Sequence, residues 1–256
     1  MSLFKSGNPT LSENKFRDTI IDLPVSGENT MTVRGTLNKF GFMFLMLMGT
    51  AFFSWKEFSD STGTSPNLFP MVIGGAIGGF IIAIIMVFKQ NWSPFLAPLY
   101  ALCEGLFIGA VSAQYNYVFP GLVMNAVGLT FGVGVSMYLL YSFRIIRATE
   151  KFKAVVMTAT VGIAIFYFIA WILGMFGFHG LSYIHQGNGT FSILFSLFVV
   201  AIASLNLIMD FDMIEQGSAM GAPKYMEWYG AFGLMVTFVW LYLEILRLLS
   251  KLSSRD

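Results

Sequence analysis

The chain has 256 residues, of which 56% are hydrophobic and 11% are charged, and its formal net charge is +1. Soluble domains carry about 25% charged residues, so this chain has too little charge to cover a water-facing surface, and lipid must be its main solvent. The absence of a strongly basic block excludes nucleic acid as an expected partner, and the single cysteine, Cys103, excludes an internal disulfide.

The N-terminal segment, residues 1–35, is polar and mixed in charge, and we expect it to lie in the cytoplasm. A membrane domain is predicted over residues 36–252. Crossing the bilayer takes about 20 apolar residues in a helix. Seven runs approach or exceed this length, at about 37–55, 68–88, 95–113, 120–142, 154–176, 190–209 and 226–249. Because the runs are continuous rather than alternating, they favour helices over barrel strands and predict an all-α integral membrane protein, a seven-helix bundle.

Several features of these runs predict details of the bundle. Pro120 is expected in the first turn of the fourth helix, where its missing N–H costs little. The seventh run is the most polar, and we expect it to be central. Three glycine pairs have the small-xxx-small spacing that lets helix backbones approach closely. These pairs are Gly75/Gly79, Gly105/Gly109 and Gly128/Gly132.

Lysine and arginine are distributed unevenly between the two sides of the predicted bundle. With the N-terminus inside, the inner segments carry eleven of the fifteen, whereas the outer loops carry Lys56 alone. Cytoplasmic loops are enriched in these residues, so the N-terminus is predicted to be cytoplasmic. Seven full crossings conflict with this rule at the C-terminus, because they place Arg247, Lys251 and Arg255 outside. A re-entrant last segment or six crossings would remove the conflict, but we favour seven.

Ionisable residues within the runs are the candidate functional residues, because each costs at least about 2.5–3.5 kcal/mol to insert at membrane depth. They are Glu104 in the third run, Asp210 and Asp212 at the end of the sixth, and Glu244 in the seventh. Asn206 and Asp210 share a helix face. Asp210 and Asp212 lie about 200° apart on a continuous helix, so one is expected to face the bundle and the other the cytoplasmic rim.

Each of these residues also has a purely structural interpretation. Glu104 could be held by a hydrogen bond to a neighbouring helix, and Glu244 could reach the outer surface, paired with Arg247 at i+3. Residues beside the predicted loop could be ordinary interfacial acids: Asp212, Glu215 and Glu227. The functional interpretation is a hydrated path whose carboxylates bind cations when ionised and release them when protonated. Because burial and neighbouring charges change where a carboxyl titrates, such a path would respond to pH.

Enzymatic chemistry is not expected. The sequence has no phosphate loop, nucleophile elbow or zinc-protease spacing. Asp210 and Asp212 lie on one predicted helix, whereas an intramembrane aspartyl protease needs two aspartates on different helices. No cofactor is expected, apart from Ca²⁺ as a transported or bound ion, and the lipid bilayer is the expected partner together with a possible membrane protein.

Three stretches of the sequence resemble a known family. They are Met31-Thr-Val-Arg-Gly-Thr-Leu-Asn-Lys39, Tyr100-Ala-Leu-Cys-Glu-Gly-Leu-Phe-Ile-Gly109, and the end of the chain from Asp210-Phe-Asp-Met-Ile-Glu215 through Met226-Glu-Trp-Tyr229 to Trp240-Leu-Tyr-Leu-Glu-Ile-Leu-Arg247. Together they are similar to the Bax inhibitor family of seven-helix membrane proteins, in particular its bacterial YccA/Bax-inhibitor-like branch. The similarity covers about residues 31 to 250.

The resemblance implies a calcium-permeable, pH-sensitive leak in a bacterial inner membrane, with a role in stress response. It also implies a sensor made of two aspartates on the last two helices. Asp212 best matches the first, with Asp210 as its rival, and Thr237 stands where the second is expected. Glu104, Asp210 and Glu244 are the candidates to replace that second carboxylate. The alternative function is a non-conducting membrane regulator that binds a protease or a stress-response partner.

Overall fold

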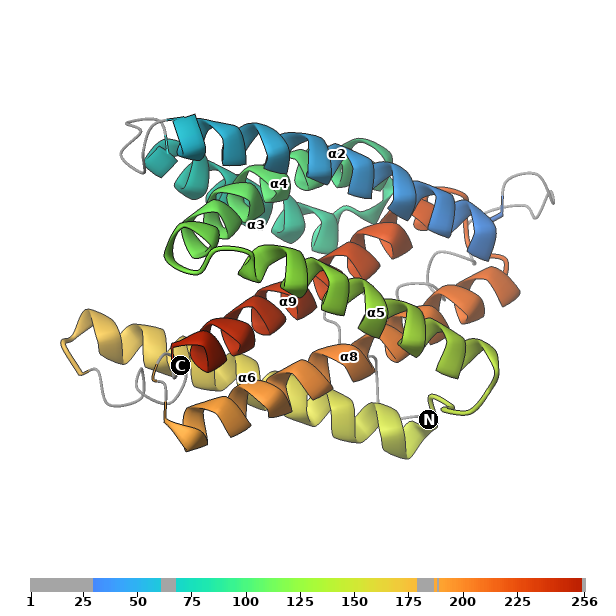
Figure 1. Cartoon of the computed structure of the whole chain (residues 1–256). Helices are drawn as coiled ribbons and strands as arrows, with labels where there is room; N and C mark the ends of the chain where they lie inside the picture. The colour runs from blue at the N-terminus through green and yellow to red at the C-terminus, as the bar shows by residue number, and fades with distance from the viewer. Residues whose placement is uncertain (1–29, 61–67, 179–186, 188, 255–256) are drawn as a thin grey trace. The chain divides into compact units, whose positions relative to one another are not determined.

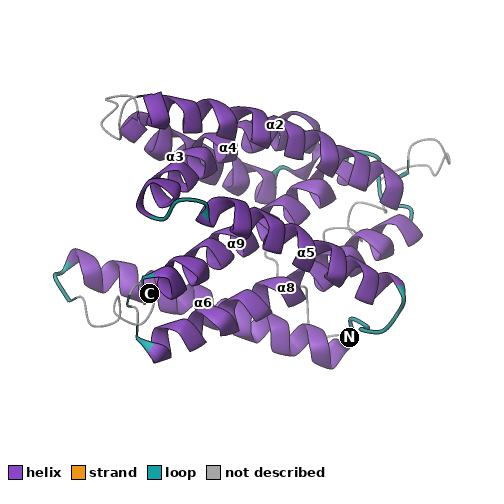
Figure 2. Ribbon diagram, in the orientation of Figure 1, coloured by secondary structure: helices purple, strands orange, loops and turns teal. Residues whose placement is uncertain are grey.

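The computed structural model describes residues 30–60, 68–178, 187 and 189–254. This part of the chain contains seven long helices, joined by turns and loops (Figures 1 and 2). They are α2 (Val33–Asp60), α3 (Leu68–Phe88), α4 (Ser93–Val118), α5 (Leu122–Ser142), α6 (Glu150–Met175), α8 (Thr190–Ala219) and α9 (Met226–Ser253), with a short 3-10 helix, η2 (Gln90–Trp92), before α4. All seven are long and apolar enough to cross a membrane. The predicted all-α, seven-helix membrane protein is therefore confirmed.

Most of the helices are longer than the apolar runs that predicted them. The sixth run ends at residue 209, but α8 continues through Asp210 and Asp212 to Ala219. The last helix, α9, is continuous over 28 residues, about 42 Å at 1.5 Å per residue, so it has no re-entrant break. Of the polar N-terminal segment predicted over residues 1–35, residues 1–29 lie outside the described residues.

The start of α5 differs from the prediction. Pro120 lies before the helix, which begins at Leu122, so the expectation that Pro120 occupies its first turn is wrong. Gly121, between them, has a φ of +82°, in the left-handed region that favours glycine. The chain therefore turns at Gly121 before it enters the helix.

The chain divides into two compact units. The α2–α4 unit contains α2, α3, η2 and α4, together with the end of α8 from Asp212 and the start of α9 up to Val236. The α5–α6 unit contains α5, α6, the part of α8 up to Phe211 and the part of α9 from Thr237.

Glycines bring the helix backbones of the α2–α4 unit close together. A Cβ atom added at Gly105 of α4 would lie 2.3 Å from the carbonyl oxygen of Leu47 in α2, and one at Gly109 would lie 2.1 Å from that of Ala51. On the other side of α4, a Cβ atom at Gly75 of α3 would lie 2.6 Å from the carbonyl oxygen of Cys103. These glycines let α2 and α3 pack directly against α4, as their spacing predicted.

The third glycine pair does not behave in this way. A Cβ atom at Gly128 or Gly132 of α5 would meet no atom of the described chain within 4 Å. The close helix contact expected there is therefore wrong, and spacing alone did not distinguish a packed face from an open one. Large apolar side chains are also exposed on the same helix, for example Met124 at 73%. This face of α5 is suited to lipid.

The α5–α6 unit has an apolar core between α6, α8 and α9. It is formed by Ile163, Val199 and Ile202, with Ala159, Tyr167, Phe195 and Trp240 packed against them. The helix α9 contributes to both units. It is the most buried of the seven helices, because 61% of the residues in its most apolar 18-residue stretch are buried. Gly230, Thr237 and Glu244, which are seven residues apart along this helix, are all buried. Of the seven helices, α9 is therefore the least exposed, although α2 is the more polar one.

Candidate functional site: buried charged clusters

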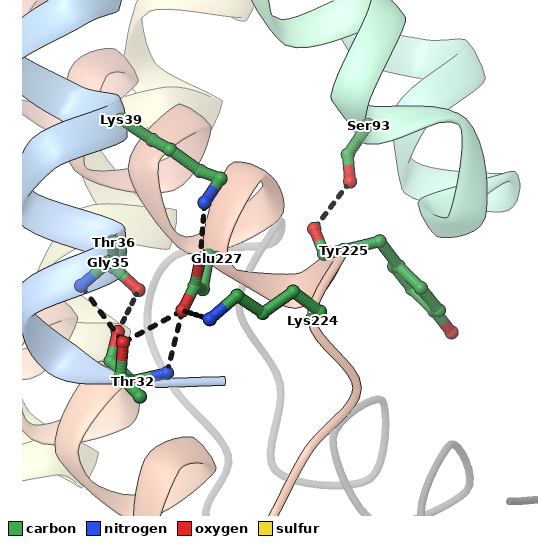
Figure 3. A network of polar contacts seen from close by, with 8 residues as sticks. All are labelled: Thr32, Gly35, Thr36, Lys39, Ser93, Lys224, Tyr225 and Glu227. Carbon is green, nitrogen blue, oxygen red and sulfur yellow. Dashed lines mark hydrogen bonds and ion pairs between the residues drawn. The ribbon is translucent and has the colours of Figure 1, made fainter. Parts of the chain in front are cut away.

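The most extensive polar cluster of the α2–α4 unit surrounds Glu227, in the first turn of α9 (Figure 3). The backbone N–H and the hydroxyl of Thr32 donate hydrogen bonds to its Oε1 atom at 2.9 and 2.8 Å. Lys39 of α2 forms an ion pair with Oε2, and Lys224 forms one with Oε1 at 3.1 Å. The Glu227 side chain has an exposed fraction of 0. Glu227 is therefore enclosed by these partners and not exposed to a solvated loop.

The local structure at the start of α2 explains why Glu227 fits there. The hydroxyl of Thr32 accepts a hydrogen bond from the N–H of Gly35 at 3.0 Å, as an N-cap does for the helix that begins at Val33. The free N–H groups and the partial positive charge of a helix N-terminus attract an anion, and Glu227 supplies it. Gly35 is required for this approach, because a Cβ atom there would lie 2.1 Å from Glu227 Oε1.

Backbone contacts reinforce this junction. The N–H of Met31 donates to the carbonyl oxygen of Ala222 at 2.6 Å, and Thr30 and Pro223 form an isolated antiparallel bridge. The hydroxyl of Ser218 donates to the carbonyl oxygen of Met31 at 3.2 Å. The residues before α2 are thereby attached to the connection between α8 and α9.

A second cluster, in the α5–α6 unit, surrounds Glu244 of α9. One nitrogen of Arg247, Nη1, donates to both carboxylate oxygens of Glu244 at 2.8 and 2.9 Å. The hydroxyl of Tyr167 in α6 donates to Glu244 Oε1 at 3.1 Å and accepts from Arg247 at 3.0 Å. The i+3 pairing is confirmed, but the carboxylate does not reach the surface, because Glu244 is 1% exposed.

Lys251, in the last turn of α9, is buried although the sequence placed it in a tail beyond the helix. Its ammonium donates to the hydroxyl of Ser196 at 2.7 Å and to the carbonyl oxygen of Ser192 at 3.2 Å, both in α8. These partners are neutral, so the α5–α6 unit holds two cations, Arg247 and Lys251, near one carboxylate.

The sequence-predicted residues of α8 differ in their surroundings. Asn206 is buried, and its side-chain nitrogen donates to the hydroxyl of Thr160 at 2.8 Å and to the carbonyl oxygen of Ile202 at 2.9 Å. Asp210, one turn further along the same face, has an exposed fraction of 0. Asp212 is partly exposed and accepts a hydrogen bond from Gln216 of its own helix. Asp210 is therefore inside and Asp212 is more exposed, and the cytoplasmic rim as the surroundings of the second aspartate stays a prediction.

The remaining predicted residues lie on α4 and α9. Glu104 is partly buried and hydrogen-bonded to Tyr100, four residues earlier on its own helix. Its Oε2 atom lies 3.1 Å from the position of a Cβ atom at Gly79 of α3. Thr237 is 3% exposed, at the point where α9 enters the α5–α6 unit.

The predicted residues therefore belong to different parts of the fold. Glu104 and Asp212 are in the α2–α4 unit, whereas Asn206, Asp210, Thr237 and Glu244 are in the α5–α6 unit. Within the described residues, no group of three or more His, Cys, Asp or Glu side chains is arranged to hold a metal ion.

Sequence reasoning missed Lys39 and Lys251 as parts of the clusters. Lys39 gave a signal, because it is an ionisable residue inside the first predicted run, and such residues require a partner. Lys251 gave none, because it lies past the end of the last predicted run.

These features define a polytopic helical membrane protein that buries carboxylates within apolar helices. The profile of the family described as Bax inhibitor 1 like matches residues 8–254, and the chain belongs to this family. The match begins at residue 8, so the expectation that the similarity starts near residue 31 is wrong. Comparison with curated proteins and with solved structures gave no match.

Proposed function

We propose that the protein is a pH-sensitive cation leak, for Ca²⁺ or H⁺, gated by protonation of intramembrane carboxylates. The observation that carries this proposal is Asp210, a carboxyl group with no exposed surface on a long apolar helix. Burying a carboxylate in a membrane protein is costly, and such residues commonly mark ion or proton pathways. The proposal assigns no catalytic chemistry to the protein.

Burial favours Asp210 over Asp212 as the sensor of the proposed leak. Asp210 shares its helix face with Asn206, which is hydrogen-bonded to Thr160 of α6. Asp212 is more exposed and bonded to Gln216 of its own helix. An ionised carboxylate attracts a cation and a protonated one does not, so flux is expected to fall as the pH is lowered.

Flux into liposomes tests the proposal. Purified protein is reconstituted with a Ca²⁺ indicator or a pH indicator inside the vesicles, and uptake is followed on both sides of neutral pH. Asp210→Asn is expected to lower the flux and remove its pH dependence, whereas Asp212→Asn, the matched control on the same helix, should retain both. The proposal fails if the protein passes neither cation at any pH. It also fails in its assignment of Asp210 if Asp210→Asn behaves as wild type.

A second candidate is a non-conducting membrane regulator that binds a protease or a stress-response partner. The observation that favours it is that Glu227 and Glu244 already have resident cations, Lys39 and Lys224 for the first and Arg247 for the second. Such pairs can serve to hold one conformation rather than to conduct. Capture of a partner in a fixed stoichiometry, together with no cation flux, would support this function.

The proposed setting is a bacterial inner membrane with a cytoplasmic N-terminus. The distribution of Lys and Arg between the connecting segments supports this orientation.

A further inference from the structure

We propose that Glu227, Lys39 and Lys224 form an electrostatic latch that holds the start of α2 against the start of α9 and thereby keeps the proposed cation leak closed. This inference rests on the proposed function for its effect on flux, but the latch itself can be tested without flux. All of its parts belong to the α2–α4 unit.

The charges of the latch favour two alternative states, one closed and one separated. The Glu227 carboxylate binds two ammonium groups and the N-terminus of α2 at the same time. If this carboxylate moved away, three positive groups would be left facing one another. Removing one partner of a buried ion pair is strongly destabilising, whereas the complete pair adds little stability over an apolar contact. The arrangement therefore specifies one geometry when closed and favours separation once broken.

Two of the three charged groups are accessible from outside the junction. The side chain of Lys224 is 51% exposed and that of Lys39 is 20% exposed, whereas Glu227 is not exposed. Lys39 also lies over the ring of Trp228, with its Nζ atom 5.4 Å from the ring centre. The carboxylate is thus enclosed by cations that are themselves partly exposed at the surface of the unit.

The latch is connected to a candidate gating residue through close backbone packing. From its start at the latch, α2 runs against Gly105 and Gly109 of α4, where the two backbones nearly touch. The same helix α4 carries Glu104, and its Tyr100 packs edge-on against Phe232 of α9, with ring centres 4.8 Å apart. A displacement of α2 would therefore be transmitted to the surroundings of Glu104.

The observed conformation is the closed one in this proposal. Asp210, the proposed sensor, has an exposed fraction of 0, so its carboxylate meets no solvent in this conformation. Conduction requires hydrated carboxylates, so the open state must differ from this one.

Two substitutions open the latch by different physical means. Glu227→Gln keeps the shape of the side chain and removes its charge. Gly35→Ala keeps every charge, but its Cβ atom would lie 2.1 Å from Glu227 Oε1 and displace the carboxylate. Both are expected to raise the flux by about tenfold, a typical size for a coupling between two sites. The matched control, Glu150→Gln, neutralises a glutamate whose side chain is 57% exposed and should leave the flux unchanged.

A disulfide provides the converse test. Thr30 and Pro223 are bridge partners, and such a pair has a Cα separation suited to a disulfide. The test uses a Cys103→Ala background that carries Thr30→Cys and Pro223→Cys. When the two cysteines are oxidised to a disulfide, the rise in flux caused by Glu227→Gln should disappear, and reduction of the disulfide should restore it. An increase that survives the cross-link would overturn the latch as the cause.

The distance between two spin labels tests the latch even in a protein that passes no cation. Asn38 and Ala219 are exposed positions on α2 and at the end of α8 in the same unit, so labels there should not disturb the junction. In Glu227→Gln and in Gly35→Ala, the distance between the two labels should be longer and its distribution broader than in wild type or in Glu150→Gln. An unchanged distribution refutes the latch, even in a conducting protein. A changed distribution in a protein without flux supports the latch and rejects the cation leak.

Discussion

The packing of α2 on α4 gives a sharp prediction for Gly109→Ala. The added Cβ atom would lie 2.1 Å from the carbonyl oxygen and 2.6 Å from the Cα atom of Ala51. Both are backbone atoms, so no side chain can rotate away, and an ordinary contact needs at least 3.4 Å. The helices must separate by about 1.3 Å, the difference between 3.4 and 2.1 Å. Overpacking of this kind costs about 2–3 kcal/mol.

The matched control is Gly128→Ala, whose Cβ atom would meet nothing of the described chain within 4 Å. Alanine is the better helix former by about 1 kcal/mol, so the control should be neutral or slightly stabilising. Thermal unfolding of the purified proteins in detergent measures both. Gly109→Ala should lower the Tm by about 4–12 °C, at about 2–4 °C per kcal/mol for a chain of this size. Equal Tm values for the two variants would refute direct backbone packing between α2 and α4.

Three further predictions concern the C-terminal half of α9. Arg247→Met leaves the carboxylate of Glu244 buried without its cation and should lower the free energy of unfolding by about 3–5 kcal/mol. The double variant that also carries Glu244→Gln should have a clearly higher Tm than Arg247→Met alone. Lys251→Met removes a buried charge held by neutral oxygens, so its Tm should equal or exceed that of wild type; a marked fall would show that the bonds to α8 are essential. A cysteine at Ser253, in a Cys103→Ala background, should react with a membrane-impermeant maleimide added outside the cell, and protection there would contradict seven crossings from a cytoplasmic N-terminus.

The helices could be predicted from the sequence because hydrophobicity acts over continuous runs. The run at 68–88 coincides with α3. The ends of other helices could not be predicted in the same way. The first predicted run ends at residue 55, before Lys56 and Glu57, yet α2 includes both, since a helix can continue past the apolar layer with polar residues. Apolar length therefore measures the lipid-facing part of a helix and not the whole helix.

The partners of the buried charges could not be predicted, because they are distant in sequence. Glu227 binds Thr32, 195 residues away, and Lys39, 188 residues away. Its local context, next to a turn with Gly221 and Pro223, suggested a solvated loop. By contrast, the pairing of Glu244 with Arg247 could be predicted, because both lie on one helix at a spacing that brings side chains together. Sequence spacing identifies partners within a helix, whereas contacts between helices require the fold.

The resident partners of the buried acids separate structural from conducting roles. A carboxylate that already binds an ammonium or guanidinium group must release it before it can bind a passing cation, and that release is costly in a buried site. Glu227 and Glu244 are in this position, since Lys39 and Arg247 occupy them. Glu104 differs, because the partner that the structure gives it is the neutral hydroxyl of Tyr100. A hydroxyl can remain in place while a cation binds the carboxylate, so Glu104 is better suited than either ion-paired acid to contact a permeating ion. Glu227, in the same unit as Glu104, is better suited to hold the helices of that unit together, and Glu244 is better suited to hold those of its own unit.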